Sequence, residues 1–355
     1  MNKKRKENKM ISAAKGIGIL LVLIGHFGFI PEVKRFIYLF HMPLFFFLSG
    51  YFFKTRRFDE LPKYVVSKLK SLYIPFVLCN FFALIFHNLF CQIGIYSMDD
   101  RFSNVSQIVK YSIKILLCMK MEDIVAPLWF LPILMFVCIG YNCITLLIKN
   151  EKVVTLCVGA FFLLAYILIY LGKIGGPFRA EILVGTGMWV FRLGHIYSEK
   201  ESLIKKYTQS PIGILCCIWG LVLLSLFTDV NMIQMRFSNP VFFTMGALFG
   251  INVTLWCASK LQDVDILRYC GNNSLDILEW HYWAAIPISL LQCHIYDIEV
   301  IGIVVLSKSK LVWSIAYLVV GIIVPLLIMQ IKKILRTFRK MSDSEKIRVH
   351  SRDIQ

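Results

Sequence analysis

The sequence predicts an all-α fold: a polytopic membrane helix bundle of about ten transmembrane helices, with the N- and C-termini in the cytoplasm. Three observations support this prediction. Hydrophobic residues make up 57% of the 355-residue chain, the mean hydropathy is +0.67, and apolar runs of about 20 residues recur along the sequence. Because a helix rises about 1.5 Å per residue, each such run can cross a hydrocarbon core about 30 Å thick.

The apolar runs define the predicted spans. They cover residues 11–30, 36–53, 69–90, 127–148, 153–171, 180–197, 211–227, 240–258, 275–293 and 311–331. The first run has no small-residue cleavage site and is followed at once by a second, so we interpret it as a retained helix rather than a signal peptide. The eleven cysteines lie mostly inside these runs and form no CxxC pair, which is typical of small buried side chains rather than of a disulfide or metal framework.

Basic residues set the predicted orientation, because cytoplasmic loops retain lysine and arginine. The densest short loop is KTRRFDELPKYVVSKLK, residues 54–70, and it falls on the same side as the basic segments near both ends of the chain. The formal net charge of +17 then reflects topology and attraction to anionic lipid, and no nucleic-acid partner is expected. A phosphate site in this loop fits the same account, with candidate ligands Arg56, Arg57, Lys68 and Lys70.

The longest loop, residues 91–126, is predicted on the outer side. It begins with the polar string YSMDDRFSNVSQ and continues as IVKYSIKILLCM, in which Lys110 and Lys114 share one helical face. This pattern indicates an amphipathic helix lying on the membrane. A lid over an outward-facing acceptor site is the alternative, since long ordered loops are often functional.

Two histidines in the first two spans are the main candidate functional residues. His26 lies roughly 22 Å from the inner end of its span and His41 roughly 8 Å from the outer end of the next, so both fall at a similar depth and can be neighbours. An ionisable group in hydrocarbon is costly, and one that persists usually marks a pathway or a reaction site. For His26 the alternative is a histidine bonded only for packing. His41 lies beside Pro43 and near the interface, where a structural role is equally natural.

Weaker candidates lie later in the chain. Arg192 and Glu279 both fall near the inner ends of their spans, where they can pair inside the bundle, or Arg192 can extend its charge to the interface. His281 follows the polar GNNS cluster, which is typical of a helix start. A functional role is one interpretation of His281, and a histidine that is only bonded to the backbone is the alternative. Interfacial placement accounts for the remaining histidines at or near span ends: His87, His195 and His294.

Motifs of soluble enzymes are absent from the sequence. It has no GxSxG elbow, no HExxH metal site, no Walker loop and no paired carboxylates at metal-ligand spacing. Soluble-type hydrolase or nucleotide chemistry and a bound metal are therefore not expected.

Several strings together resemble the acyltransferase 3 family of bacterial integral membrane acyltransferases. SAAKGIGILLVLIGH places Lys15, Gly16 and His26 in register with the first helix of that family, and FHMPLFFFLSGYFF follows it. LWFLP at residues 128–132, GALFG further on and GNNSLDILEWH ending at His281 match later landmarks of the family in order. The resemblance spans nearly the whole chain and includes a ten-helix topology.

Two positions depart from the family pattern. The acidic residue usually found three positions before Lys15 is Ser12 in this chain. The Arg-x-x-Arg pair usually found just before the proline of the third helix is replaced by Lys68 and Ser71, with Lys70 nearby. A lysine is a point charge and does not give the bidentate phosphate recognition of an arginine.

The resemblance implies transfer of an acyl group, most often acetyl from acetyl-CoA, to a hydroxyl of a cell-surface glycan or a lipid-linked sugar. It also implies a multi-pass protein of the bacterial cytoplasmic (inner) membrane, in contact with membrane lipid. The expected organisation is one transmembrane acyltransferase domain over residues 1–340 and a short polar cytoplasmic tail over residues 341–355, with no extracytoplasmic hydrolase-like domain. The expected catalytic residues are His26, His41 and His281. The expected residues for the acyl-CoA co-substrate are Lys15, Arg56, Arg57, Lys68, Lys70 and Arg192.

In this interpretation His26 acts as general base on the acceptor hydroxyl, or as a transient acyl carrier. The competing class is a transporter or flippase of a polysaccharide precursor or small metabolite. About ten helices, polar groups near the midplane and helix-breaking prolines are equally natural in that class. Its usual sign, matching interrupted helices in two halves, is not seen in the sequence.

Overall fold

The structure of the chain, a computed structural model, describes residues 7–28, 30–237, 239–300, 302, 304–305 and 311–352, with side chains up to residue 335 except that of residue 177. Over these residues every regular element is a helix, apart from one isolated β-bridge between Asn231 and Arg236. The α-helices are α1 (Lys9–His26), α2 (Pro31–Tyr38), α3 (His41–Tyr51), α4 (Leu61–Lys68), α5 (Ile74–Ile85), α6 (His87–Gln92), α7 (Val105–Leu116), α8 (Phe130–Leu147), α9 (Glu151–Tyr170), α10 (Pro177–Glu199), α11 (Glu201–Thr208), α12 (Pro211–Phe227), α13 (Pro240–Leu261), α14 (Asp265–Asn272), α15 (Ser274–Tyr296) and α16 (Leu311–Arg352). Shorter helical turns are η1 (Phe58–Glu60), η2 (Leu69–Tyr73), η3 (Met98–Asp100) and η4 (Asp123–Trp129).

The all-helical prediction is confirmed, and the structure supports about six membrane-spanning helices. In the described part of the chain, six helices are long and apolar enough to cross a bilayer: Lys9–His26, Phe58–Ile85, Asp123–Leu147, Glu151–Tyr170, Pro240–Leu261 and Leu311–Leu335. The pair α11 and α12, bent by 75°, adds a seventh if it is one broken span. The count of ten transmembrane helices stays a prediction. Helices α10 and α15 form at two of the predicted spans, but they are less apolar than the six helices named above.

The predicted second span is broken in the structure. Residues 36–53 divide into α2 and α3 around Phe40, whose φ of −142° and ψ of −16° are not helical. The cause is Pro43: inside a continuous helix its ring would clash with the carbonyl of Leu39, four residues earlier. In the first turn of a new helix, where the backbone N–H groups have no helical acceptor, a proline is tolerated. His41 therefore becomes the first residue of α3.

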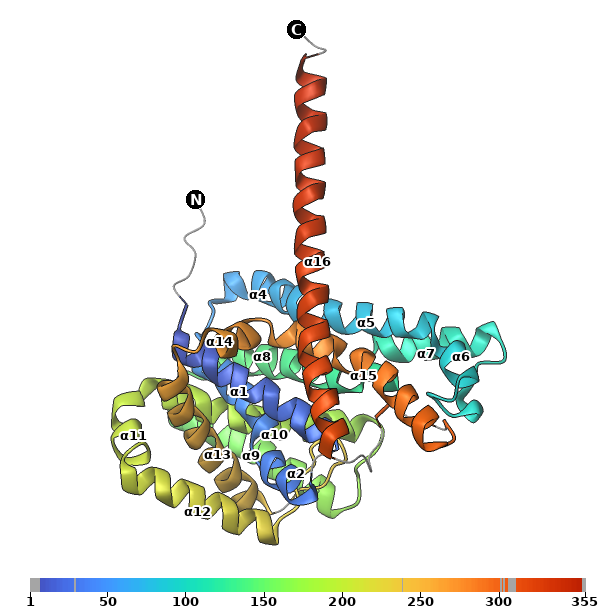
Figure 1. The fold of residues 1–355 in the computed structure, drawn as a ribbon. Coiled ribbons are helices and arrows are strands. Elements are labelled where there is room, and N and C mark those ends of the chain that lie inside the picture. Colours follow the sequence, from blue (N-terminus) through green and yellow to red (C-terminus); the bar gives the residue numbers. More distant parts are fainter. Residues whose placement is uncertain are drawn as a thin grey trace.

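The first helix begins, and the last helix ends, on the same side of the helical bundle. Figure 1 shows α1 beginning, and α16 ending, at the same side of the molecule, and α16 extends well beyond the other helices. This arrangement agrees with termini that share one face of the membrane. The predicted boundary at residue 340 falls inside α16, which continues to Arg352. Of the predicted tail, the side chains of residues 341–352 and the whole of residues 353–355 are outside the described set.

The helix predicted in the long loop is present as α7. It packs against α5. Tyr73, the last residue of η2 and the one just before α5, donates a hydrogen bond from its hydroxyl to the carbonyl of Leu116, the last residue of α7, at 2.7 Å. At the other end of the loop, Asn88 exchanges two hydrogen bonds of 3.0 Å with the backbone of Phe102. The loop is thus a structured cap alongside α5 and α6.

Within this cap His87 is buried, which corrects its interpretation as an interfacial side chain. It lies beyond the end of the apolar helix at Ile85, and its side chain is 6% exposed. Nδ1 lies 2.9 Å from a carboxylate oxygen of Glu122, and Nε2 lies 2.9 Å from the carbonyl oxygen of Asp100. Both partners are acceptors, so both ring nitrogens carry a proton and His87 is an imidazolium. Burial alone would lower its pKa, but the bonds to Glu122 and Asp100 outweigh burial and raise the pKa.

Close backbone contact joins α3 to α10 at the centre of the bundle. A Cβ atom on Gly194 of α10 would overlap the carbonyl of Phe47, and one on Gly50 of α3 would overlap the carbonyl of Phe191. Only glycine lets two helices approach this closely, as in other tightly packed membrane bundles. The two glycines fix the register in which α3 meets α10, and α3 carries part of the site described below.

The contact at Gly194 gives a first prediction. Gly194→Ala should destabilise the purified protein by about 1–3 kcal/mol or more, because the new methyl group meets backbone that cannot move aside. Thermal melting in detergent measures the loss. Gly159→Ala on α9 is the matched control, since its Cβ would meet nothing closer than 3.6 Å. Equal melting temperatures for the two variants would contradict this account.

The His87 pair gives a second prediction, on pH. Its folded pKa lies above the unfolded value of about 6.5, so its stabilisation is complete below that value and is lost as the pH rises through the folded pKa. The melting temperature should therefore fall as the pH rises above about 6.5. His87→Gln should remove this part of the fall, while His294→Gln, at an exposed position, should keep it. A His87→Gln protein with the wild-type pH profile would show that another group titrates.

Candidate active site

Helices from opposite ends of the chain meet at a cluster of His26, His281 and Tyr282. His26 is the last residue of α1, and the other two side chains come from α15. The Tyr282 hydroxyl lies 2.6 Å from Nδ1 of His26. The centre of the His281 ring lies 5.5 Å from that of His26. The structure thus brings together two of the three histidines that were predicted as catalytic.

His26 is the accessible histidine of the three. Its side chain keeps some exposed surface, whereas His41 is 5% exposed and His281 is 0% exposed. Because Nδ1 of His26 is bonded to Tyr282, its other nitrogen, Nε2, is the one available to a substrate. A hydrogen bond at one nitrogen decides which tautomer a histidine adopts and orients the ring.

His281 is held by its own helix. Its Nδ1 lies 3.1 Å and 3.0 Å from the carbonyl oxygens of Ile277 and Leu278, so this nitrogen carries the proton. These bonds match the alternative role expected for His281, that of a histidine bonded to the backbone. Its Nε2 is left as an acceptor, buried and without a hydrogen-bond partner among the described residues. A second basic nitrogen therefore faces the interior close to His26.

His41 is connected to the cluster through Tyr38. The two rings lie 4.7 Å apart, and the Tyr38 hydroxyl donates to the carbonyl oxygen of Gly25 at 3.2 Å, next to His26. Nδ1 of His41 lies 3.0 Å from the carbonyl oxygen of Ile37. In the described part of the chain no hydrogen bond or ring contact joins His41 to His26 directly. Tyr38 therefore links the two histidines.

A cavity of about 430 Å³ leads from one end of the bundle towards this cluster. Its α1 wall consists of Lys15, Ile19 and Val22. These positions and His26 recur at intervals of three and four residues, so they share one helical face, and His26 lies one turn beyond Val22. The α15 wall ends at Leu278, one turn before His281. The cavity thus points at both histidines.

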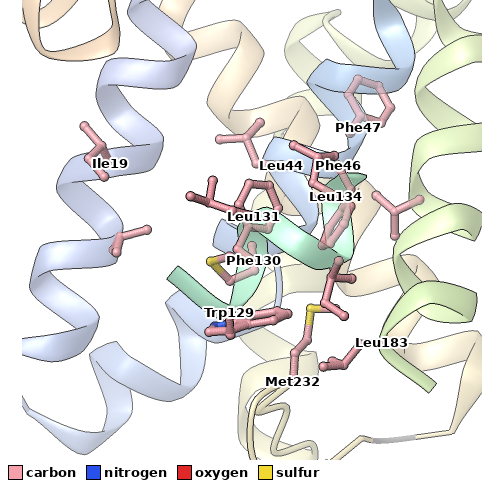
Figure 2. Packing of buried hydrophobic residues seen from close by; sticks show 14 of the residues in the cluster. Ile19, Leu44, Phe46, Phe47, Trp129, Phe130, Leu131, Leu134, Leu183 and Met232 are labelled. Atoms are coloured by element: carbon pink, nitrogen blue, oxygen red, sulfur yellow. The ribbon is translucent and has the colours of Figure 1, made fainter. Parts of the chain in front are cut away.

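The body of the cavity is apolar. Besides α1, side chains of α3 and α8 line it, among them Phe45, Phe130 and Leu131. Figure 2 shows Phe130, Leu131 and Leu134 of α8 between α1, which carries Ile19, and α10, which carries Leu183. A thin, largely uncharged molecule fits such walls, and a charged group does not.

The mouth of the cavity is cationic. Lys15, Lys54, Arg56 and Lys68 line it together with Tyr64. The Arg56 guanidinium and the Lys68 ammonium lie 5.9 Å and 5.3 Å from the centre of the Tyr64 ring, so one tyrosine holds both charges near the opening. The backbone N–H of Arg56 donates to Asn142 Oδ1 at 2.9 Å, which fixes the loop that carries it. We call this opening the cationic mouth.

Three predicted acyl-CoA residues lie at the cationic mouth, and three do not. Lys15, Arg56 and Lys68 line it. Arg57 is exposed and pairs with Asp59 at 3.2 Å. Lys70 lines a separate open groove beside α4. The sixth residue, Arg192, lies in a polar network elsewhere in the bundle. Half of the predicted acyl-CoA residues therefore line the mouth, together with Lys54.

Arg192 pairs with Glu151 and not with Glu279, which corrects that prediction. Its guanidinium lies 2.7 Å from the Glu151 carboxylate and 3.0 Å from the Tyr141 hydroxyl. A third bond of 3.1 Å reaches the hydroxyl of Thr155. With its donors engaged and its side chain 3% exposed, Arg192 ties α10 to α8 and α9. Glu279 lines a different groove, together with Lys332.

One group of side chains has the composition of a metal site. Atoms of Glu151, His195 and Glu199 lie within 4.8 Å of one another. The Arg192 guanidinium lies in the same place, 2.7 Å from Glu151 and 3.3 Å from Nδ1 of His195. An arginine already supplies the positive charge there, so the geometry is that of an ion-pair network rather than of a cation cage.

Two tyrosines of the cluster were not predicted from the sequence. Tyr282 directly follows His281, and Tyr38 precedes His41 by three residues. A tyrosine beside a candidate histidine is a weak signal, because Tyr282 contacts the histidine of a helix 256 residues earlier in the chain. Lys54 was recognised as part of the basic loop but not as a lining residue.

The fold and site define a helical membrane protein with an interior cavity that runs from a cationic mouth towards buried histidines. The model of a protein family described as an acyltransferase domain matches residues 8–330. The chain belongs to this family, acyltransferase 3, as the sequence motifs predicted. Comparison with curated proteins and with solved structures gave no match.

Proposed function

We propose that this protein is a membrane-embedded O-acyltransferase of the bacterial cytoplasmic membrane. It moves an acyl group, acetyl in the simplest case, from cytosolic acyl-CoA to a hydroxyl of a cell-surface or lipid-linked glycan. The observation that supports this best is the cavity whose cationic mouth and apolar walls share one face of α1 with His26. Membership of the acyltransferase family gives the reaction class.

The cavity matches the chemistry of an acyl-CoA. Lys15, Arg56 and Lys68 bind the phosphates, and the bulky nucleotide stays at the opening. The apolar walls accept the narrow pantetheine arm and exclude water from the thioester. In this arrangement the thioester lies near Val22 and Leu278, one turn from His26 and His281. The cationic mouth then faces the cytoplasm, where acyl-CoA is present.

His26 is the proposed general base. Its Nδ1–H donates to the Tyr282 oxygen in the active tautomer, which leaves the lone pair of Nε2 for the acceptor hydroxyl. As Nε2 takes the hydroxyl proton, the oxygen forms a bond to the thioester carbonyl carbon. The carbon–sulfur bond breaks, and the CoA thiolate leaves and takes up the proton from the imidazolium. Tyr282 is a positioning residue in this scheme, since it orients the His26 ring.

The reaction is tested directly with purified protein, labelled acetyl-CoA and surface glycan. Label that appears in alkali-labile ester on the glycan supports O-acyl transfer. A protein that moves glycan or its precursor across a vesicle membrane and leaves it unlabelled would instead be a transporter or flippase.

The donor site gives a third prediction. Arg56→Ala combined with Lys68→Ala should raise the apparent KM for acetyl-CoA about tenfold or more, equivalent to about 1.4 kcal/mol, because two phosphate contacts are lost. The matched control is Arg57→Ala combined with Lys70→Ala. It removes the same charge from the same loop at positions that do not line the cavity. Equal KM values for both double variants would place the phosphates elsewhere.

The fourth prediction concerns His26. His26→Ala should lower the rate of acyl transfer by about 10²–10⁴-fold or more, because a positioned base contributes that much, and His26→Gln should not restore it. Membrane levels and detergent melting should stay close to wild type, since no charge is left unpaired. His294→Ala is the control at an exposed histidine. Near wild-type transfer by folded His26→Ala protein would point to His281, whose Nε2 is a free acceptor.

A further inference from the structure

A second cavity, of about 370 Å³, lies at the other end of α1 from the cationic mouth. Its walls are α2, the last turn of α12 and the turn that follows α12. We call it the distal pocket. Its polar lining residues are Lys34, Arg35, Tyr38, Thr228, Asp229, Asn231 and Arg236.

The distal pocket carries an excess of positive charge. Three cationic side chains line it, against the single carboxylate of Asp229. That carboxylate is already paired with Arg236 at 2.7 Å. Lys34 and Arg35 form no ion pair with any described residue, and the Lys34 ammonium lies 5.2 Å from the centre of the Tyr38 ring. Two positive charges of the pocket are thus not compensated.

The position of Arg236 is fixed by its backbone. Its N–H and C=O pair with those of Asn231 at 3.0 Å and 2.7 Å, which closes a tight turn. The carbonyl oxygen of Ile233, at the tip of this turn, accepts a hydrogen bond of 2.8 Å from Arg179 of α10. The side chain is fixed as well, because Asp229 and Gln234 hold the guanidinium at the pocket, so little entropy is lost when it contacts a ligand.

Repulsion among the cationic side chains also favours a bound anion in the distal pocket. The evidence is the pKa of Lys34, which lies in α2, outside the six apolar helices. Burial lowers the pKa of Lys34, and the Arg236 guanidinium lowers it further, while Asp229 acts in the opposite direction. The like charges of the pocket therefore destabilise one another. A bound anion would relieve this repulsion.

The distal pocket is connected to the candidate active site by one side chain. Tyr38 lines the pocket, lies 4.7 Å from the His41 ring and donates to the carbonyl of Gly25, next to His26. Tyr38 thus contacts both Lys34 and the backbone beside His26. An acceptor bound in the pocket would bring a sugar hydroxyl to His26 past the Tyr38 ring, while an anionic group on the same or an adjacent sugar stays in the pocket.

We propose that the distal pocket selects an acidic acceptor, binding a carboxylate or phosphate of the glycan through Lys34, Arg35 and Arg236. This inference rests on the proposed acyl transfer and adds the substrate class. The pocket opens at the opposite end from the cationic mouth, so donor and acceptor enter from different sides. Carboxylate and phosphate share the required chemistry, since both accept hydrogen bonds from ammonium and guanidinium groups.

Binding is tested first, because it does not depend on catalysis. The full-length protein in detergent is titrated with methyl glucuronide, glucose 6-phosphate and, as the neutral probe, methyl glucoside, and thermal stabilisation gives each Kd. Wild type should bind one of the anionic sugars at least tenfold more tightly than the neutral one. Lys34→Ala combined with Arg35→Ala should abolish this difference. Lys173→Ala, at an exposed lysine that lines no described pocket, is the matched control and should keep it.

Acetyl transfer to the same sugars is measured next. The double variant should lose at least tenfold in kcat/KM for the anionic acceptor and keep its rate on the neutral one. Selective anion binding without any acetyl transfer would leave the distal pocket intact and overturn the proposed reaction instead.

Three results would overturn the distal pocket as an acceptor site. The first is equal affinity of wild type for neutral and anionic sugars. The second is an anion preference that survives in the Lys34→Ala, Arg35→Ala protein. The third is that the Lys34→Ala, Arg35→Ala protein loses the preference for anionic sugars in vesicles that contain phosphatidylglycerol but keeps it in phosphatidylcholine vesicles and in detergent. That last result would assign the charges to an anionic lipid headgroup.

Discussion

Every polar group inside this apolar bundle must find its partner within the protein, because hydrocarbon offers none. This constraint explains where the ionisable side chains lie. Inside the bundle Arg192 is satisfied by Glu151 and Tyr141, and in the cap beside it His87 lies between Glu122 and the carbonyl of Asp100. Each network ties together helices that would otherwise meet only through apolar contacts. The networks around Arg192 and His87 are therefore structural, and the candidate active site lies elsewhere in the bundle.

The candidate site is arranged along α1. Lys15 is at the cationic mouth, His26 is at the far end of the same helix, and the distal pocket begins at Tyr38 just beyond it. Between them lies the cavity, whose walls are largely apolar side chains. In the proposed function, one helix presents a donor cavity and an acceptor pocket to the same imidazole from opposite ends. The break between α2 and α3 makes this arrangement available, because it turns Tyr38 and His41 towards α1.

Much of the fold and part of the site could be predicted from the sequence. Apolar runs of sufficient length predicted the helices, and the motif around Lys15 and His26 led to the family that the comparison confirmed. The sequence analysis did not predict the helix break at Phe40, although Pro43 indicates it. Hydropathy reports how apolar a segment is and contains nothing about the clash of a proline ring with the helix backbone. Arg192 was assigned the wrong partner, since depth along a helix says nothing about which face meets which neighbour.

The sequence by itself determined that this is a helical membrane protein, because hydrophobicity acts through composition and spacing along the chain. Only the tertiary structure decided that Tyr282 bonds His26, that Arg56 and Lys68 flank one tyrosine, and that Lys34 and Arg236 share a pocket. These contacts join residues distant in sequence. They depend on the angle and register at which helices pack. Close contacts such as that of Gly194 with Phe47 fix this angle and register, and no local sequence pattern encodes them.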